Sequence, residues 1–167
     1  KDLAKTVDET VNIGIKYNDS VLNIFSVKGE ESALTSKLVP ISPLNCSSIG
    51  KIILANKNDL ELMSYFNNKL YEKRTPNSIS TFEDFKKEQK KILESEISID
   101  DEEYEHGLFC IAVPLKNHKG ILPAAVSMTG PKVRMEMKNI DTLIRKMKEK
   151  TEIINDILIK MKFELDY

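Results

Sequence analysis

The sequence predicts an α+β fold, in which a mostly antiparallel sheet carries flanking helices and a long C-terminal helix. Three observations predict it. Apolar and polar residues alternate near the N-terminus, and two apolar runs bounded by turn signals follow between residues 108 and 129. Between these regions, and from Met135 onward, apolar residues recur at helical spacing. Strands and helices do not alternate strictly, and the sequence has no Gly-rich phosphate loop, so a doubly wound nucleotide-binding fold is excluded.

The N-terminal part of the sheet is expected to begin with a hairpin. Strands are predicted over residues 10–17 and 20–28, because apolar and polar side chains alternate in both, and Asn18-Asp19 between them is a turn signal. A polar loop is expected over residues 29–36. Residues 39–44 should be extended, because each proline biases the residue before it away from the helical region.

Three helices are predicted in the middle of the chain, each preceded by a short polar residue that can cap a helix N-terminus. The candidate caps are Ser47 or Ser48, Asn58 or Asp59, and Thr81. The second helix is expected to place Leu60, Met63 and Phe66 on one face.

Strands return after the helices. Ile97 and Ile99 indicate a short strand, and residues 108–115 and 121–129 should pair as a hairpin around a turn at residues 117–120. Gly130-Pro131 is expected to stop the second strand of that hairpin. Apolar residues at helical spacing then predict one long amphipathic helix that begins near Met135.

Composition limits the kinds of protein this can be. The chain has 167 residues, 25 Lys and Arg against 26 Asp and Glu, and a formal net charge of −1, so it lacks the positive field of a free-standing nucleic-acid binder. No apolar run is long enough to span a membrane, and the first residues, Lys1 to Lys5, show no signal-peptide pattern. Two cysteines, Cys46 and Cys110, exclude a disulfide scaffold and fit a reducing cytoplasm. Because the chain does not begin with Met, we expect residues before Lys1.

Chemistry alone leaves most candidate residues open. Seven acidic residues lie between Glu94 and Glu105, and most should face solvent. Asp100 should lie on the opposite strand face from Ile97 and Ile99, where it would face either a pocket mouth or water. Cys110 lies within an apolar strand, where a buried thiol is the simpler interpretation.

Two further features could belong to a polar site. Cys46 precedes a predicted helix, whose first N–H groups could hold an anion. Ser127 and Thr129 share one strand face, either as ordinary surface hydroxyls or as a pocket floor. The histidines His106 and His118 belong to no catalytic motif, so no catalytic residue is predicted.

Three blocks of sequence resemble one known family. Residues 100–114 closely resemble the D-D-E-E-x-x-x-G-x-x-C-I-A-x-P block of the IclR family of bacterial transcriptional regulators. Residues 124–131 look like its A-x-S-x-S-G-P block, and residues 43–55 match its P-L-x-x-T-A-x-G-K-A-x-L-A block. The resemblance implies the C-terminal effector-binding domain of that family, which has a GAF-like or PAS-like fold.

The family's organisation then implies how this chain is used. Residues 1–167 would form the ligand-sensing domain, with residues 1–6 as the end of a linker helix. The family's N-terminal winged helix-turn-helix domain, which binds DNA, is absent from this chain. Family members dimerise through the DNA-binding domains and form tetramers through the effector domains, so a homodimer or homotetramer is expected. No cofactor, metal or membrane is implied.

The resemblance also implies a set of effector-binding residues and reverses the simpler interpretations of Cys110, Ser127 and Thr129. The effector would be a small organic keto acid, sugar acid or aromatic acid. The implied positions are Ser48, Ile49, Asp100, Cys110, Ser127 and Thr129.

Three departures from the family pattern accompany this assignment. Ile49 is bulky where the family has a small residue, Thr129 replaces Ser, and Pro123 suggests an edge or a bulge in its strand. Two other hypotheses stay open. One is a metal or catalytic site built from Asp100, Cys110 and Cys46. The other is a degenerate domain with a closed pocket, whose role is assembly.

Overall fold

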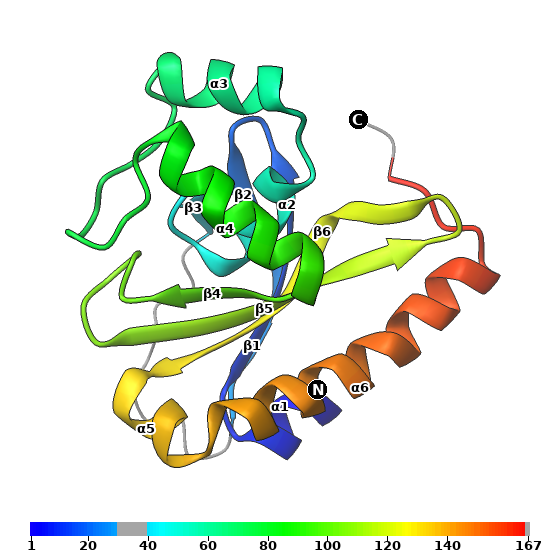
Figure 1. The fold of residues 1–167 in the computed structure, drawn as a ribbon. Coiled ribbons are helices and arrows are strands. Elements are labelled where there is room, and N and C mark those ends of the chain that lie inside the picture. The colour runs from blue at the N-terminus through cyan, green and yellow to red at the C-terminus, as the bar shows by residue number, and fades with distance from the viewer. Residues whose placement is uncertain (30–39, 166–167) are drawn as a thin grey trace.

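The computed structural model describes residues 1–29 and 40–165. Within them, six strands form one antiparallel sheet in the order β3-β2-β1-β6-β5-β4 (Figure 1). The strands are β1 (Thr10–Tyr17), β2 (Ser20–Val27), β3 (Ile41–Pro43), β4 (Ser98–Asp101), β5 (Leu108–Asn117) and β6 (Gly120–Pro131). The helices are α1 (Asp2–Val7), α2 (Ser48–Ala55), α3 (Asp59–Asn67), α4 (Phe82–Ser95), α5 (Lys132–Met137) and α6 (Ile140–Lys160). The α+β class and both predicted hairpins are confirmed.

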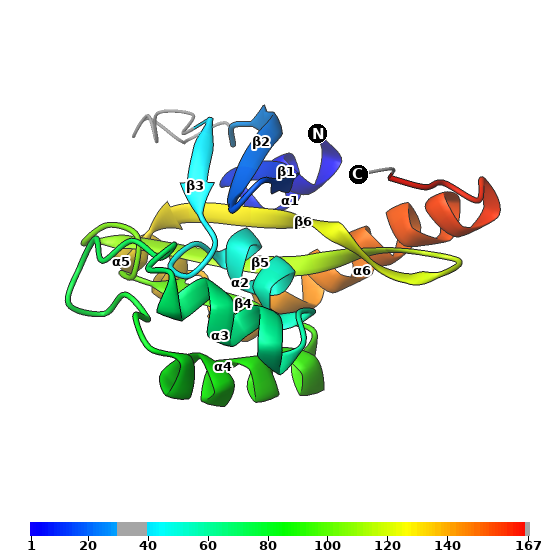
Figure 2. The same ribbon diagram turned by 90° about the horizontal axis from the view of Figure 1, so that it is seen from above.

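Helices cover both faces of the sheet. In Figure 1, α2, α3 and α4 lie above the central strands, and α1, α5 and α6 lie below them. Strand alternation explains the two cores: Val126 and Met128 of β6 pack with α5 and α6, whereas Ala125 belongs to the cluster under α2. The view from above shows α3 and α4 on one side and β2 and β3 curling away on the other (Figure 2).

The predicted helix caps are present. The side chain of Ser47 accepts a hydrogen bond from Gly50 N at 3.2 Å, and Thr81 accepts from Asp84 N at 3.1 Å. Asn58 accepts from Glu61 N at 3.0 Å, and Glu61 in turn accepts from Asn58 N. These caps fix where α2, α3 and α4 begin.

The predicted face of α3 is correct for Phe66 and wrong for the other two residues. Leu62, Tyr65 and Phe66 are buried, whereas Leu60 is 80% exposed and Met63 is also exposed. Phe66 packs on Phe85 of α4 with ring centroids 5.7 Å apart, and Tyr65 packs edge-on against Phe66, so the buried face is centred on the aromatic pair.

The predicted C-terminal elements need one correction. Strand β6 ends at Pro131, so the stop predicted at Gly130-Pro131 is confirmed, although Gly130 still pairs with Phe109 of β5. The long helix is divided, because Asn139 adopts φ 62° between α5 and α6 and its side chain caps α6 at Thr142 N. Helix α6 buries Leu143, Met147 and Thr151.

Other expectations resolve along the sheet. The pairing of β5 with β6 is irregular between Pro114 and Lys116, opposite Pro123, so the predicted bulge is confirmed. The polar loop predicted over residues 29–36 lies, beyond Gly29, outside the described residues, as does Val39.

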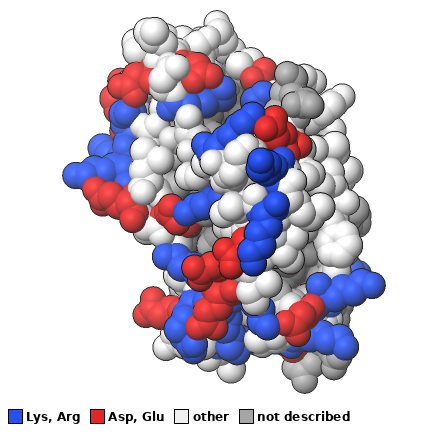
Figure 3. Space-filling view, turned by 90° about the vertical axis from the view of Figure 1, so that its right-hand side faces the viewer, with Lys and Arg blue, Asp and Glu red and all other residues white. Residues whose placement is uncertain are grey.

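No helix in the described part of the chain has the length and apolarity to cross a bilayer. Charges of both signs are interspersed on the face shown in Figure 3.

Candidate functional site

The candidate site lies on the sheet face beneath α2. Antiparallel register sets Asp100 of β4 beside Cys110 of β5, and Cys110 beside Thr129 of β6. Ser127 lies two residues before Thr129 on β6, on the same face of the sheet, beside Asn12 of β1. Four of the predicted site residues, which come from three strands, are therefore brought together.

Hydrogen bonds join this polar row. Thr129 Oγ1 donates to Cys110 Sγ at 3.4 Å. Asn12 Nδ2 donates to Thr129 Oγ1 at 3.4 Å and to Ser127 Oγ at 3.5 Å. Because the Asn12 amide supplies donors to both oxygens, the Ser127 hydroxyl proton is left to donate elsewhere. Sequence reasoning missed Asn12; its signal was its alternation with Val11 and Ile13, which places it on this face.

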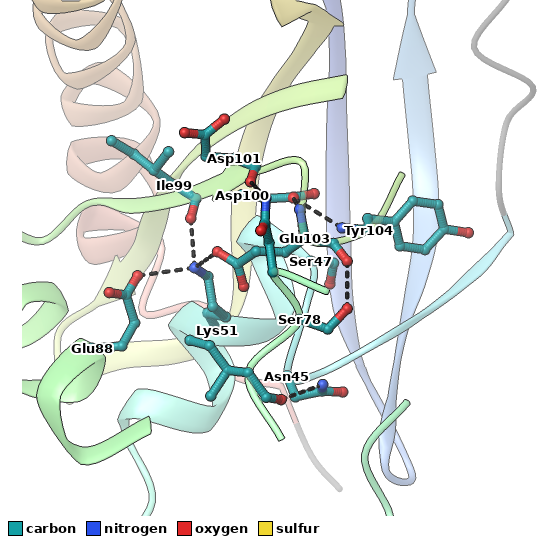
Figure 4. Close-up of polar contacts among 12 residues, drawn as sticks. Asn45, Ser47, Lys51, Ser78, Glu88, Ile99, Asp100, Asp101, Glu103 and Tyr104 are labelled. Atoms are coloured by element: carbon teal, nitrogen blue, oxygen red, sulfur yellow. Dashed lines mark hydrogen bonds and ion pairs between the residues drawn. The ribbon is translucent and has the colours of Figure 1, made fainter. Parts of the chain in front are cut away.

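Asp100 is the buried carboxylate of the site. Its Oδ1 accepts from Glu103 N at 2.8 Å and from Tyr104 N at 3.1 Å, so it orders the turn after β4 (Figure 4). Burial raises the pKa of Asp100 to about 6, although the backbone donors and Lys51 act in the opposite direction. Asp100 lies opposite Ile97 and Ile99, which pack into the other core, as predicted.

The first turn of α2 stands over this face. Ser48 and Ile49 are its first two residues, both are buried, and their N–H groups have no partner within the helix. Ile49 is packed tightly against β1, since its Cδ1 is 3.0 Å from the position that a Cβ on Gly14 would take. The bulky side chain therefore fills the space above Gly14.

A buried ion network fixes α2 to the rest of the site. Lys51 Nζ donates to Glu88 Oε1 of α4 at 2.9 Å, to Ile99 O of β4 at 2.5 Å, and to Glu103 Oε1 (Figure 4). Burial lowers the pKa of Lys51, but the charges of Glu103 and Glu88 outweigh it, so the net shift is upward and Lys51 stays protonated.

Glu103 corrects the expectation of a solvated acidic loop. It is buried, and its Oε2 has no hydrogen-bond partner among the described residues. Burial raises the pKa of Glu103 to about 7, against the influence of Lys51. Glu103 lies within a run of acidic residues that gave no local signal, whereas Lys51 is the one charged residue of the otherwise uncharged stretch 46–56, and sequence reasoning missed that signal.

The segment between α3 and α4 closes one end of the site. Thr75 Oγ1 donates to Glu102 O at 2.7 Å, and Ser78 Oγ donates to Glu103 O at 2.7 Å. The guanidinium of Arg74 lies 4.1 Å from the ring centroid of Tyr104. This segment and the turn after β4 thus hold each other in place.

Asn45 anchors the same segment from the chain leading into α2. Its Nδ2 donates to Glu72 O at 2.8 Å and to Ile79 O at 2.7 Å, and its Oδ1 accepts from Glu72 N at 3.0 Å. Asn45 therefore satisfies backbone groups on both sides of the loop that closes the site.

The two thiols are not poised for metal binding. Burial and the nearby carboxylates of Asp100 and Glu103 raise the pKa of Cys46 to about 12, and burial also raises the pKa of Cys110. Metals bind thiolates, which these shifts disfavour. Across the described residues, no group of three or more His, Cys, Asp and Glu side chains could hold a metal ion.

The curled antiparallel sheet, with helices on both faces and a polar row under a helix N-terminus, defines an α+β domain of the GAF/PAS-like class. The model of the family described as "Bacterial transcriptional regulator IclR C-terminal" matches residues 1–155. The chain therefore belongs to the IclR C-terminal family, and the predicted family and fold are confirmed.

Individual relatives agree with this assignment. The chain is 29% identical over 154 residues to the DNA-binding transcriptional repressor YiaJ of Escherichia coli (strain K12), covering 90% of this chain and 55% of YiaJ. The crystal structure of a transcriptional regulator named YaiJ superposes with a TM-score of 0.89 at 27% identity, covering 94% of this chain and 89% of that one. The chain spans about half the length of the curated relatives it matches.

A second similar structure contains a ligand. It is a double mutant of the PobR inducer-binding domain from Acinetobacter, in complex with 3-hydroxybenzoic acid, with a TM-score of 0.82. It covers 92% of this chain and 91% of its own, and its identity is 19%, so the likeness is one of fold alone.

Proposed function

We propose that this chain is the effector-binding domain of an IclR-type transcription regulator and that its effector is a small organic acid. The observation that carries the proposal is the convergence of Asp100, Cys110, Ser127 and Thr129 on one sheet face beneath the first turn of α2. A site for a small molecule needs a few polar groups placed on an otherwise apolar surface, and this face has that composition.

The donors and acceptors favour an acid that also carries an oxygen substituent. The free N–H groups of Ser48 and Ile49, at the positive end of α2, suit a carboxylate. The Ser127 hydroxyl can donate to a carbonyl or hydroxyl oxygen, and ionised Asp100 can accept from a hydroxyl. Keto acids, sugar acids and hydroxylated aromatic acids meet these requirements. The 3-hydroxybenzoic acid bound to the PobR domain has both kinds of group.

Regulation would follow from coupling between this domain and a DNA-binding domain. A regulator of this kind binds DNA through an N-terminal winged helix-turn-helix domain, to which residues 1–6 would lead. Effector binding would shift an equilibrium between domain arrangements and so change the affinity for DNA. We place the protein in the cytoplasm, without a catalytic role or cofactor, as a homodimer or homotetramer.

Thermal unfolding with a panel of acids tests the proposal. The probes are pyruvate, gluconate and 3-hydroxybenzoate, each with its amide as a neutral control. A ligand at a hundred times its dissociation constant stabilises by about 2.7 kcal/mol, which raises the Tm by several degrees at this chain length. Ser127→Ala should weaken the shift, whereas Ser64→Ala, on the exposed surface of α3, should leave it unchanged.

Two outcomes count against the proposal. One is that no acid raises the Tm, which would favour a closed domain whose role is assembly. The other is that an acid and its amide stabilise equally and Ser127→Ala has no effect, which would mean that the ligand lies elsewhere.

A further inference from the structure

We propose that Asn12 of β1 is a specificity-determining residue of the candidate site, and that it makes the site select acids that carry a hydroxyl group beside Ser127. The inference rests on the proposed function, because it concerns the effector of the same site. Among the acids that fit the site, it favours those with a hydroxyl at this position over those with a ketone or ether oxygen there.

Strand register places Asn12 in the site. Asn12 is paired with Ser127 of β6, and its neighbour Val11 packs into the core on the other face of the sheet. Two residues along β1, a Cβ on Gly14 would lie 3.0 Å from Ile49 Cδ1, so this face of β1 points toward α2. Asn12 therefore lies on the face that α2 covers, at the end of the polar row opposite Asp100.

The hydrogen bonds of the row have one consistent direction. Thr129 Oγ1 donates its only proton to Cys110 Sγ at 3.4 Å, so toward Asn12 it acts as an acceptor. One end of the Asn12 carboxamide meets both Thr129 and Ser127, and only Nδ2 has protons to give. The network thus fixes Nδ2 toward the two hydroxyls and Oδ1 away from them.

The thiol at the other end of the row supports this direction. Asp100 lies beside Cys110 in the strand register, and an ionised carboxylate acts only as an acceptor. Burial and the Asp100 charge raise the pKa of Cys110, so the thiol keeps its proton. That proton is attracted toward Asp100, which leaves the sulfur lone pairs to accept from Thr129.

Two groups beside each other are then left for a ligand. The Ser127 hydroxyl accepts from Asn12, so its own proton is available. Asn12 is only partly buried, and its Oδ1 accepts no hydrogen bond from the residues that the structure describes. Directly paired residues have Cβ atoms about 5 Å apart, so one ligand oxygen between the two side chains can contact both.

A hydroxyl satisfies both groups, whereas a ketone or an ether oxygen satisfies one. The hydroxyl oxygen accepts from Ser127, and the hydroxyl proton goes to Asn12 Oδ1. An oxygen without a proton leaves Oδ1 unpaired, and a site built to bond a hydroxyl discriminates against analogues that lack it. One hydrogen bond corresponds to about a tenfold difference in dissociation constant.

Isothermal titration calorimetry with matched pairs of acids tests the inference. The pairs are lactate and pyruvate, gluconate and 2-ketogluconate, and 3-hydroxybenzoate and 3-methoxybenzoate. Members of a pair carry the same charge, so the readout is the ratio of the two dissociation constants, that of the acid without the hydroxyl over that of the hydroxy acid. At pH 8, where Asp100 is ionised, a pair that binds the wild type should give a ratio of about ten.

Two variants of Asn12 should move this ratio in opposite directions. Asn12→Asp has no proton to give, so it accepts from Ser127, which then faces the ligand with lone pairs only. The ketone loses its donor while the hydroxyl can still donate, so the ratio should rise at least about fivefold above the wild type. Asn12→Ala removes the acceptor Oδ1, so the ratio should fall to near one. A merely structural role would weaken both members of a pair equally.

Asn68→Asp, which makes the same change at the exposed end of α3, should leave the ratio unchanged. If circular dichroism shows that Asn12→Asp does not fold, Asn12→Ala decides alone. A wild-type ratio below about two, or ratios that stay the same in the folded Asn12 variants, overturns the inference and leaves the proposed function standing. Failure of every acid to bind the wild type overturns the proposed function and this inference with it.

Discussion

Replacing Lys51 by Met should be among the most damaging single changes in the domain. The Lys51 ammonium is buried and donates to Glu88 Oε1, Ile99 O and Glu103 Oε1. Met fills a similar volume but leaves those acceptors without their donor. Removing one partner of a buried ion pair costs about 3–5 kcal/mol, a large part of a total stability of about 5–15 kcal/mol.

The cost should depend on pH. The pKa of Glu103 is about 7 and that of Asp100 is about 6, both raised by burial. Without Lys51 both carboxylates lose a compensating charge, so their pKa values should rise further. At pH 8 the variant must bury them as anions, whereas at pH 5 both are protonated, so the cost should be at least about 1 kcal/mol smaller there.

Urea unfolding followed by circular dichroism measures this at both pH values. Lys57→Met is the matched control, because Lys57 pairs with Glu61 at 2.9 Å on the surface of a helix end. That pair should contribute less than about 0.5 kcal/mol. Adding Glu103→Gln to Lys51→Met should recover part of the loss, because it removes an uncompensated anion. A cost below about 1 kcal/mol, or one that is equal at pH 5 and pH 8, would refute the reasoning.

Three further predictions follow from the same geometry. In the wild type, burial raises the carboxyl pKa values, so the folded state binds more protons than the unfolded state between pH 4.5 and about 7. The free energy of unfolding should therefore fall as pH rises through this range. Glu103→Gln should flatten that slope, as measured by urea unfolding at several pH values. Gly130→Ala should lower the free energy of unfolding by about 1–3 kcal/mol in thermal melts, because the added Cβ would lie 2.4 Å from Oε2 of buried Glu9. Glu9 accepts hydrogen bonds from the guanidinium of Arg134, which restricts its movement. An unchanged stability would show that Glu9 can move. Ile49→Ala should lower the free energy of unfolding by about 2–4 kcal/mol and open the space above Gly14. Bulkier acids should then raise the Tm more than they do in the wild type. If the order of the acids by Tm shift is unchanged, Ile49 does not determine which acid binds.

Much of the sheet face could be predicted because strand parity is a local property. Asp100, Cys110, Ser127 and Thr129 alternate with apolar neighbours, and antiparallel pairing of adjacent strands then brings them together. Their shared face follows from alternation and pairing, whereas the family resemblance supplied the expectation that they bind a ligand.

The parts that were missed depend on contacts between distant segments. Glu103 looks like an ordinary surface charge, and the partners of Lys51 cannot be read from its apolar helix, because only the meeting of α2, α4 and the end of β4 brings the two together. Asn12 lies far from Ser127 in sequence, and only the pairing of β1 with β6 joins them. The division between α5 and α6 depends on one residue, Asn139, whose left-handed φ interrupts an otherwise continuous helical pattern.

The central claim is that a small acid binds between the first turn of α2 and the polar row of the sheet. The most direct measurement is a ¹H–¹⁵N correlation spectrum of the labelled chain, titrated with each acid of the panel and with its amide. The account predicts saturable shifts, for an acid and not its amide, that centre on the amides of Ser48, Ile49, Asp100 and Thr129. Shifts confined to other parts of the molecule, or no saturable shift with any acid, would contradict it.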